Sequence, residues 1–454
     1  MPKLVLANPH SRAMTARLDD LPAKTRRGCD IEAARMLWSL AADDIAVIPG
    51  PVDKAFLDYL TDVLGMPGSV PTVLSMQDYG GTNWYPHDNA ELVAEIGNRI
   101  AASGFDLREW TVSCYIRDRD IAHWERLLGL DTDAAPYAQD LAALINSKAV
   151  FRALAAAAGT PIPEGYVVDA GTELVDTVVE LIHRTGSVIV KQDLNSGGYG
   201  NTLITIDTDV IGFGAAQVVR LAADSDLTSA LPRALHRNDL VLGDTLDLPR
   251  GMAPAKFIVE VYQPDSRSLS SELHIPRFGA PVLRNYGEMR MEPMWSGFVL
   301  PPQDLPATLH AQFCADSQQI ARSAQRLGYH GLINIDAIVS TDYHLTYTEF
   351  NGRAGGVTNI DTIARRLLGA DYLHNHVLLT RNGLRVPRVA QLVEHLARVG
   401  IRFDAARGRG IVVGTDDPVT GAIEYVAIGR DYAEAVHLEQ QLANLATELA
   451  TPAN

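Results

Sequence analysis

Two alternating apolar and polar runs, separated by a short polar turn, constrain the fold of this chain more than any other segment. The runs are GLINIDAIV and HLTYTEF, and both are rich in β-branched and aromatic residues. This pattern is typical of a β-hairpin. A two-residue turn at Thr341 and Asp342 predicts that Asn334 lies opposite Glu349.

The hairpin is predicted to carry oxygen ligands on one face. Residues two apart on a strand share a face, so this pairing places Asp336, Glu349 and Asn351 together, with Asp336 diagonal to Glu349. Two carboxylates and an amide suit a hard cation such as Mg²⁺. Alternatively, the two carboxylates point to solvent. An odd change in the length of the turn would place them on opposite faces.

A second segment, SVIVKQDLNSGGYGNTLITI, joins an apolar strand ending in Lys191 to a glycine-rich loop. A buried ammonium group needs an anion as partner. Small residues allow backbone N–H groups to approach phosphate oxygens. The loop consists of Ser196, Gly197, Gly198, Tyr199 and Gly200. The alternative is a glycine-rich turn beside a surface lysine, and the absence of GxxxxGK[ST] excludes a P-loop.

Two weaker signals come from a helix and a strand. Lys148 and Arg152 lie four residues apart on a predicted helix and face either one anion or solvent. The strand that ends at Glu260, Val261 and Tyr262 offers backbone groups and a flat apolar surface to a purine. Alternatively, it is an ordinary strand with one exposed acid.

Length and charge limit the class of protein. At roughly 150 residues per domain, 454 residues correspond to about three domains. The formal charge of -16 disfavours nonspecific binding to nucleic acids. The three cysteines have no metal-ligand spacing, and no segment is long and apolar enough to span a membrane. We therefore expect a cytoplasmic protein with neither nucleic-acid nor membrane partners.

The pattern of elements divides the chain into three parts. Residues 1–140 alternate short apolar strands with helical segments, which favours a parallel α/β domain. Residues 141–380 are richer in strands, with a long helical pattern near Leu305 to Leu327. Residues 381–454 are expected to form a small α/β appendage.

Taken in this order, the signals resemble the ATP-grasp ligases over about residues 141 to 380. The shared features are a helix lysine, a strand lysine followed by a glycine-rich hairpin, a strand bearing a glutamate, and an aspartate before Glu-x-Asn-x-Arg. The last motif is Glu349-Phe350-Asn351-Gly352-Arg353. The resemblance implies two α+β subdomains that grip ATP, preceded by a Rossmann-like pre-ATP-grasp α/β domain.

The resemblance also implies roles for individual residues. Lys148 and Lys191 would contact the phosphates of ATP under the loop 196–200, and residues 260–262 would form the hinge strand at adenine. Asp336, Glu349 and Asn351 would hold Mg²⁺, with Mn²⁺ as an alternative. Arg353 would lie near the transferred phosphate or the carboxylate of the substrate.

The chain departs from the family pattern at two places. Arg267 stands where a ribose-binding acid is common, which leaves Asp265, Glu272 or neither for that role. Asn334 replaces an arginine that often precedes the first metal ligand. We expect Arg284 and Arg290 to grip the substrate carboxylate instead, because a guanidinium group can form two parallel hydrogen bonds with it; surface strand arginines are the alternative.

In its first segment and its size, the chain is most similar to the pheganomycin-type peptide ligases. The implied reaction activates a carboxylate as an acyl phosphate and joins it to an amine or peptide, releasing ADP and phosphate. A carboxylase that uses bicarbonate and a non-catalytic nucleotide-binding module are the alternatives. The sequence leaves the oligomeric state open, with a homodimer as one option.

Overall fold

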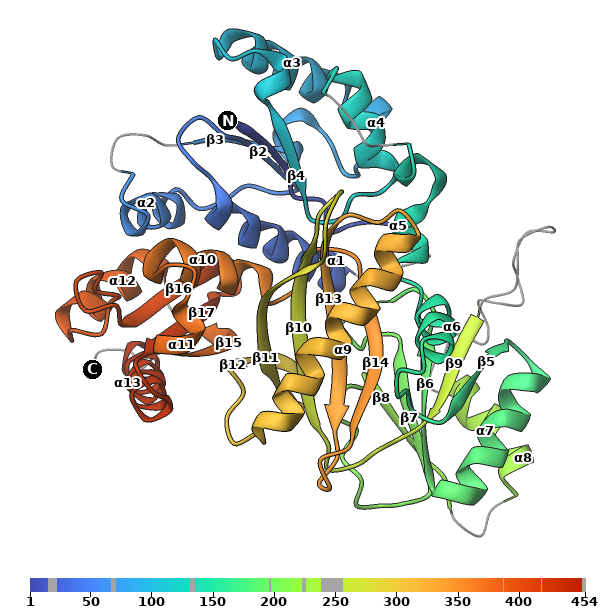
Figure 1. Ribbon diagram of the computed structural model, residues 1–454. Coiled ribbons are helices and arrows are strands. Elements are labelled where there is room, and N and C mark those ends of the chain that lie inside the picture. The colour runs from blue at the N-terminus through green and yellow to red at the C-terminus, as the bar shows by residue number, and fades with distance from the viewer. Residues whose placement is uncertain are drawn as a thin grey trace.

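A computed structural model describes residues 1–14, 23–66, 71–130, 135–195, 197–222, 226–237, 256–386, 388–417 and 419–450. In these ranges the strands form three β-sheets of four, five and eight strands, with helices packed around them (Figure 1). No helix in the described part of the chain is long and apolar enough to cross a bilayer.

The four-stranded sheet belongs to the N-terminal region and is parallel, in the order β3-β2-β1-β4. β1 and β2 are short, almost wholly buried apolar runs, as expected for central strands of a parallel sheet. The strands are β1 (Lys3–Leu6), β2 (Ile45–Ile48), β3 (Thr72–Ser75) and β4 (Thr111–Cys114). The expected α/β character of this region is confirmed.

Helices and single turns surround this sheet. The α-helices are α1 (Ala23–Ala33), α2 (Lys54–Val63), α3 (Ala90–Ala102), α4 (Arg119–Leu127) and α5 (Leu141–Leu144). The 3-10 turns are η2 (Ala34–Ser39), η3 (Met76–Tyr79), η4 (Pro86–Asn89), η5 (Leu107–Glu109) and η6 (Tyr137–Gln139). Side-chain caps fix where several begin; Asp53 accepts a hydrogen bond from Ala55 N at the start of α2.

The five-stranded sheet has the order β5-β9-β6-β7-β8. Its strands are β5 (Gly165–Asp169), β6 (Ser187–Gln192), β7 (Asn201–Thr205), β8 (Gln217–Arg220) and β9 (Lys256–Val261). The helices of this part are α6 (Lys148–Ala157), α7 (Thr172–Thr185) and α8 (Leu227–Arg237). α7 packs on β5, β6 and β9, and it ends at Gly186 in the left-handed conformation that commonly terminates helices.

The eight-stranded antiparallel sheet has the order β14-β13-β10-β11-β12-β15-β17-β16. Its strands are β10 (Arg267–Ile275), β11 (Val282–Glu292), β12 (Met294–Leu300), β13 (Gly331–Val339), β14 (Leu345–Asn351), β15 (Val377–Arg385), β16 (Gly410–Asp417) and β17 (Ala422–Gly429). The helices of this part are α9 (Ala307–Arg326), α10 (Thr358–Leu368), α11 (Tyr372–Asn375), α12 (Val389–Arg398) and α13 (Tyr432–Ala450). α9, which packs on β10, β11 and β13, is the long helix expected near residues 305–327.

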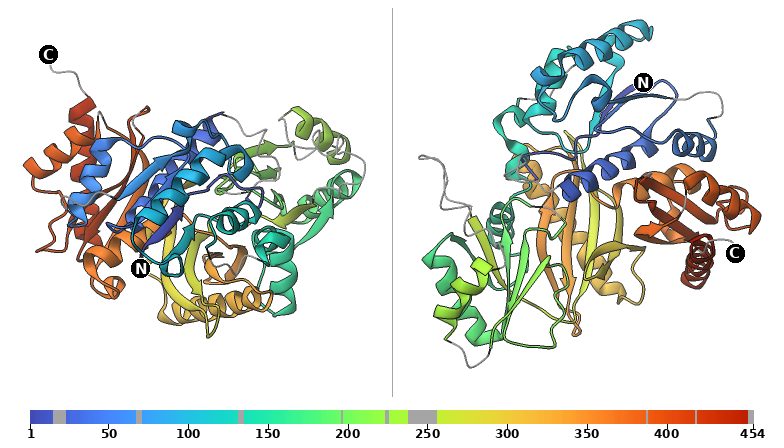
Figure 2. Two further views of the ribbon diagram at one scale, coloured as in Figure 1. Left: turned by 90° about the horizontal axis from the view of Figure 1, so that it is seen from above. Right: turned by 180° about the vertical axis from the view of Figure 1, so that it is seen from behind.

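The C-terminal strands extend this sheet, so they do not form a sheet of their own. The boundary expected at residue 380 falls inside β15, which pairs with both β12 and β17. The N-terminal region packs against the same strands, and the two ends of the chain share one hydrophobic core (Figure 2). The Trp38 indole N–H donates to Gly414 O at 2.6 Å across this contact.

Candidate active site

The β13–β14 hairpin brings Asp336 and Glu349 directly opposite each other. The expected pairing of Asn334 with Glu349 is wrong, because Asn334 faces Asn351 and Asp336 faces Glu349. The turn is longer than two residues, because the pair next to it is Val339 with Leu345. If this register continued along the strands, Thr348 would lie opposite Asp336. A bulge between Asp336 and Ala337 shifts the register by one residue and returns both carboxylates to the same face.

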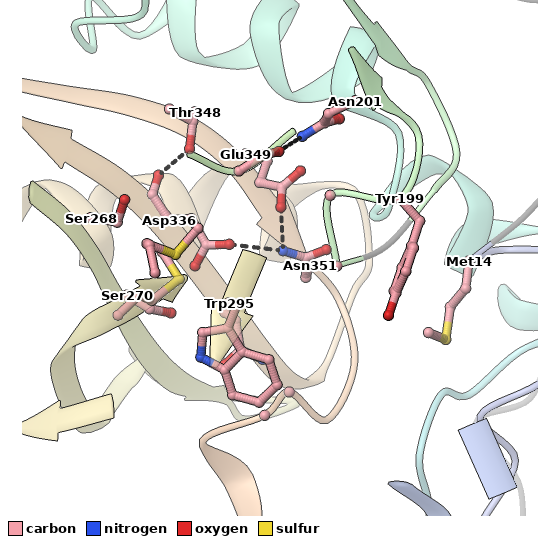
Figure 3. A pocket seen from close by; sticks show the side chains of 18 of the residues that line it. Met14, Tyr199, Asn201, Ser268, Ser270, Trp295, Asp336, Thr348, Glu349 and Asn351 are labelled. Carbon is pink, nitrogen blue, oxygen red and sulfur yellow. Dashed lines mark hydrogen bonds between the residues drawn. The ribbon is translucent and has the colours of Figure 1, made fainter. Parts of the chain in front are cut away.

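Asp336, Glu349 and Asn351 form an oxygen-rich cluster at the end of this hairpin (Figure 3). Asn351 Nδ2 lies 3.4 Å from Asp336 Oδ2 and 3.4 Å from Glu349 Oε1. The Asn351 Oδ1 atom accepts a hydrogen bond from Arg353 Nη2 at 2.9 Å. The three predicted metal ligands therefore lie together.

The two carboxylates differ in their electrostatic surroundings. Burial, with the charge of Glu349 beside it, raises the pKa of Asp336. Burial would also raise the pKa of Glu349, but the ammonium groups of Lys148 and Lys191 outweigh it and hold that pKa low. The Asp336 carboxylate would be stabilised in its ionised form by a cation placed between them.

Lys148 and Lys191 both bind carboxylates at this site. Lys148 Nζ lies 3.0 Å from Glu349 Oε2 and donates to Asn195 O at 2.8 Å. Lys191 Nζ lies 2.6 Å from Glu260 Oε2. Both lysines are buried, so each needs an anion beside it. In this structure the anions are the two carboxylates, and a polyphosphate could take their place.

One interpretation of the spacing of Lys148 and Arg152 is that both face the same anion. In the structure they bind different carboxylates. The Arg152 Nη1 atom lies 2.5 Å from Glu260 Oε1, and its Nη2 atom donates to Pro163 O and Gly165 O. Glu260 is 2% exposed and is bound by Arg152 and Lys191, so it is not an exposed acid. This carboxylate holds Lys191 in position at the end of β6.

The hinge strand places Glu260 and Val261 against a cavity, whereas Tyr262 points elsewhere. Glu260 and Val261 line the cavity described below. The Tyr262 hydroxyl donates to Ile211 O at 2.8 Å, and the Tyr262 backbone N–H donates to Ser187 O.

The glycine-rich loop between β6 and β7 lies at the same cavity. Gly197, Gly198 and Tyr199 line it, and Gly200 follows them; Ser196 lies outside the described residues. Gly198 has a φ of +75°, and a Cβ atom there would lie 2.8 Å from Gly214 O. Only glycine fits this close approach.

A cavity of about 560 Å³ lies where the three parts of the chain meet. Asp336, Glu349, Asn351 and Lys191 line it, and Lys148 contacts it through Glu349. Six further residues that line it were not predicted: Cys29, Glu32, Arg35, Tyr115, Asn201 and Trp295. Those from the N-terminal region carry no local motif that could have marked them.

The predicted arginines separate into two groups. Arg353 lines the cavity, and its Nε atom is buried without a hydrogen-bond partner among the described residues. Arg284 and Arg290 do not line it: Arg284 lies 3.2 Å from Asp361, and Arg290 binds Glu439 at 2.6 Å. The positions of Arg284 and Arg290 therefore do not support the expectation that these two residues grip the substrate. The sequence alone could not show where they lie, because their partners are remote in the chain.

The departures from the family pattern also have structural explanations. Asn334 Nδ2 donates to Arg353 O at 2.9 Å, so this residue supports the loop that carries Arg353. Arg267 binds Glu288 at the surface. Asp265 is exposed, and Glu272 is buried against Thr358 and Asn285, and neither lines the cavity. Neither of these two acids is therefore placed to bind a ribose at this cavity.

The cluster fits a magnesium ion by its donor atoms. Hard cations take carboxylate and amide oxygens, and Asp336 and Glu349 supply two carboxylates from adjacent strands. Asn351 would supply its amide oxygen once the amide group is turned over, because its nitrogen faces the two carboxylates in this structure. Among the described residues no group of three His, Cys, Asp or Glu side chains is placed to hold a metal, so a magnesium ion at this site would depend on Asn351 for its third side-chain ligand.

Two segments match models of known domain families. Residues 33–130 match the pre-ATP-grasp domain, and residues 391–442 match the PGM1 C-terminal domain. No curated protein matches the chain significantly in sequence.

Solved structures with the same fold cover nearly the whole chain. An N5-carboxyaminoimidazole synthetase from Staphylococcus aureus, complexed with ADP, has 11% identity and a TM-score of 0.53, and the alignment covers 99% of this chain and 96% of that one. The biotin carboxylase domain of the 2-oxoglutarate carboxylase of Hydrogenobacter thermophilus, in complex with MgADP and bicarbonate, has 12% identity and a TM-score of 0.52. That alignment covers 97% of this chain and 89% of the domain. An L-amino acid ligase from Bacillus licheniformis has 11% identity and a TM-score of 0.50, and the alignment covers 98% of this chain and 97% of the ligase.

These similarities concern the fold. The expected pre-ATP-grasp domain and ATP-grasp fold are confirmed. The narrower likeness to pheganomycin-type ligases stays a prediction.

Proposed function

We propose that this chain, which joins a pre-ATP-grasp domain to an ATP-grasp fold, is an ATP-dependent carboxylate–amine ligase. One observation carries the proposal: two carboxylates, an amide and two buried lysines meet at one cavity, beside a glycine-rich loop. Such a site suits a polyphosphate with its cation. We further propose that the product is a peptide bond formed in the biosynthesis of a peptide natural product.

In the proposed nucleotide complex, each part of the cavity has a role. Val261 and its neighbours on the hinge strand contact adenine, while Lys191 and the loop 197–200 contact the phosphates. Lys148 acts through its ion pair with Glu349 until a phosphate oxygen replaces that contact. Asp336, Glu349 and Asn351 would hold Mg²⁺, or Mn²⁺ as an alternative, which neutralises phosphate charge and helps to align the reacting groups.

The first chemical step transfers the γ-phosphoryl group to the substrate. A carboxylate oxygen attacks the γ-phosphorus atom, the bond to the bridging oxygen breaks, and ADP leaves with that oxygen. Arg353 is placed to stabilise this step, because its buried Nε has no partner among the described residues. The Trp295 Nε1 atom is equally without an acceptor in the described part of the cavity wall.

The second step forms the amide bond. The neutral amine attacks the acyl carbon, phosphate leaves with the former carboxylate oxygen, and the amine nitrogen loses a proton. No protein nucleophile is needed. Donors such as Arg353 would stabilise the oxyanion of the tetrahedral intermediate.

A carboxylase is the second candidate, because the fold is shared with a bicarbonate-bound carboxylase domain. It would phosphorylate bicarbonate in place of an organic acid. A nucleotide-binding module without catalysis is the third, and it is less consistent with a complete set of metal ligands and lysines.

Incubation with ATP, Mg²⁺ and pooled acids and amines distinguishes these candidates. The ligase requires both an organic acid and an amine for sustained ADP release. A requirement for bicarbonate would indicate the carboxylase, and ATP binding without turnover would indicate the module.

A further inference from the structure

The end of the cavity formed by helix α1 differs in charge from the end that holds the lysines. Arg27 and Arg35 line it, but both are already bound by carboxylates of the C-terminal strands. Arg27 binds Asp417. Arg35 binds Glu424 through two hydrogen bonds of 2.9 and 2.5 Å, and its guanidinium lies over the Trp295 ring.

Glu32 is the acid in this wall whose charge is least compensated. Its side chain is 32% exposed and lies 3.6 Å from Arg35 Nη1, beyond hydrogen-bond distance. Tyr115 donates one long hydrogen bond of 3.3 Å to Glu32 Oε2. Since Arg35 is shared with Glu424, Glu32 keeps most of its capacity to accept hydrogen bonds.

The other groups of this wall leave part of the charge of Glu32 uncompensated. Burial raises the pKa of the Cys29 thiol to about 12, so it is neutral at pH 7. Asp417, Glu424 and Glu32 together carry three negative charges against the two positive charges of Arg27 and Arg35. Arg353 is the next cation along the cavity, and its charge acts on Cys29 and Tyr115. Once the carboxylate of a substrate neutralises Arg353, this end of the cavity keeps a net charge of about -1 and favours a cation with N–H donors.

Tyr115 places this acid near Arg353. Tyr115 hydrogen-bonds Glu32 through its hydroxyl group, and its backbone O accepts from Ala354 N at 2.8 Å, directly after Arg353. Glu32 and Arg353 line the same cavity, together with Tyr199 of the glycine-rich loop. Figure 3 shows Tyr199 and Met14 across the cavity from Asp336 and Trp295.

We propose that Glu32 determines the specificity of the site by binding a protonated amino group of the acid substrate, whose carboxylate lies at Arg353. The substrate that is phosphorylated is then an amino acid or a peptide, and simple carboxylic acids are poor substrates. This inference rests on the proposed ligase function and names the residue that selects the substrate.

Hydroxylamine makes the test independent of the natural amine, because it converts an acyl phosphate into a stable hydroxamate. The twenty L-amino acids are each compared with their N-acetyl derivatives, with ATP and Mg²⁺ present, and both hydroxamate and ADP are measured. We expect at least one free amino acid to be activated with a kcat/KM about 10- to 100-fold higher than that of its N-acetyl derivative, the range of one charged hydrogen bond.

The variant Glu32→Gln should lower this preference at least tenfold, mainly by raising KM for the free amino acid. Asp30→Asn on the same helix is the matched control, since Asp30 binds His10 and does not line the cavity. Equal activation of free and acetylated acids, or a preference that survives in Glu32→Gln, would overturn the inference and leave the ligase function intact. Absence of ADP and hydroxamate from every compound would contradict the ligase function, and the inference with it.

Discussion

At the scale of single residues, the site depends on charges that are buried together. Glu349 balances Lys148 at 3.0 Å, and Glu260 balances Lys191 at 2.6 Å. A buried ion pair is a weak source of stability, and removing one partner leaves an uncompensated charge. These pairs therefore suggest a site kept for binding charged ligands.

Glu349→Gln should reduce turnover by at least about 10³-fold, because it removes a proposed metal ligand whose charge acts during phosphoryl transfer. The amide keeps the shape of the side chain but leaves the buried ammonium group of Lys148 without its anion, so the thermal unfolding temperature should fall and turnover is compared at a temperature where both proteins are folded. ADP release measures the effect. Asp342→Asn, an exposed acid in the turn of the same hairpin, is the control and should retain full activity. Normal turnover in Glu349→Gln would remove Glu349 from the metal site.

Glu272 predicts a pH dependence of stability. Burial raises its pKa from 4.5 to about 7 in the folded state. Between these values the unfolded chain loses the proton and the folded chain keeps it, so the free energy of unfolding falls as pH rises, by up to about 3 kcal/mol.

Urea unfolding at pH 5 and pH 8 measures this contribution. Glu272→Gln should be more stable relative to wild type at pH 8 than at pH 5, by about the same amount. Glu448→Gln, an exposed acid on α13, is the control. An identical difference between wild type and Glu272→Gln at both pH values would contradict a raised pKa.

At the scale of elements, the motifs predicted the hairpin and the clustering of Asp336, Glu349 and Asn351, but not the register of the two strands. The alternation of apolar and polar residues fixes which face each side chain takes, within one strand. The bulge beside Asp336 depends on how the turn closes, which no pattern in the sequence reveals. For the same reason the positions of Arg284 and Arg290 could not be predicted: their partners Asp361 and Glu439 are remote in sequence.

The loop between β6 and β7 gives a prediction for ATP binding. Gly198→Ala forces a Cβ atom to within 2.8 Å of Gly214 O at a φ of +75°, so the loop must shift from the position in which it would contact phosphates in the proposed complex. We expect KM for ATP to rise about tenfold, the equivalent of 1.4 kcal/mol. Gly171→Ala at the start of α7 has a comparable backbone strain, at φ +103°, but open space and no contact with the cavity. Its KM for ATP should not change; an equal rise in both variants would exclude a specific role for the loop.

At the scale of the whole molecule, the N-terminal and C-terminal regions form one body around the site. They share a hydrophobic core, and Arg27 and Arg35 on the N-terminal side bind acids on β16 and β17. The sequence predicted three consecutive parts, because composition and periodicity describe neighbours along the chain. The packing of the first part on the last depends on long-range contacts, which these patterns do not encode.

Trp38→Ala tests this shared core. The side chain is fully buried, and its indole N–H binds Gly414 O, so we expect a loss of about 3–5 kcal/mol in the free energy of unfolding. Both wild type and variant should unfold in one cooperative transition. Phe278→Ala, at a side chain that is 82% exposed, should change the stability little. Two separate transitions in the wild type would show that the two regions fold independently.

The most direct test of the proposed reaction follows an oxygen atom. An acid substrate labelled with ¹⁸O in both carboxylate oxygens is incubated with ATP, Mg²⁺ and an amine, and the released phosphate is analysed by mass spectrometry. Because a carboxylate oxygen attacks the γ-phosphorus atom and leaves with it, each phosphate should contain one ¹⁸O atom. Phosphate released without label, while amide product accumulates, would contradict an acyl phosphate intermediate.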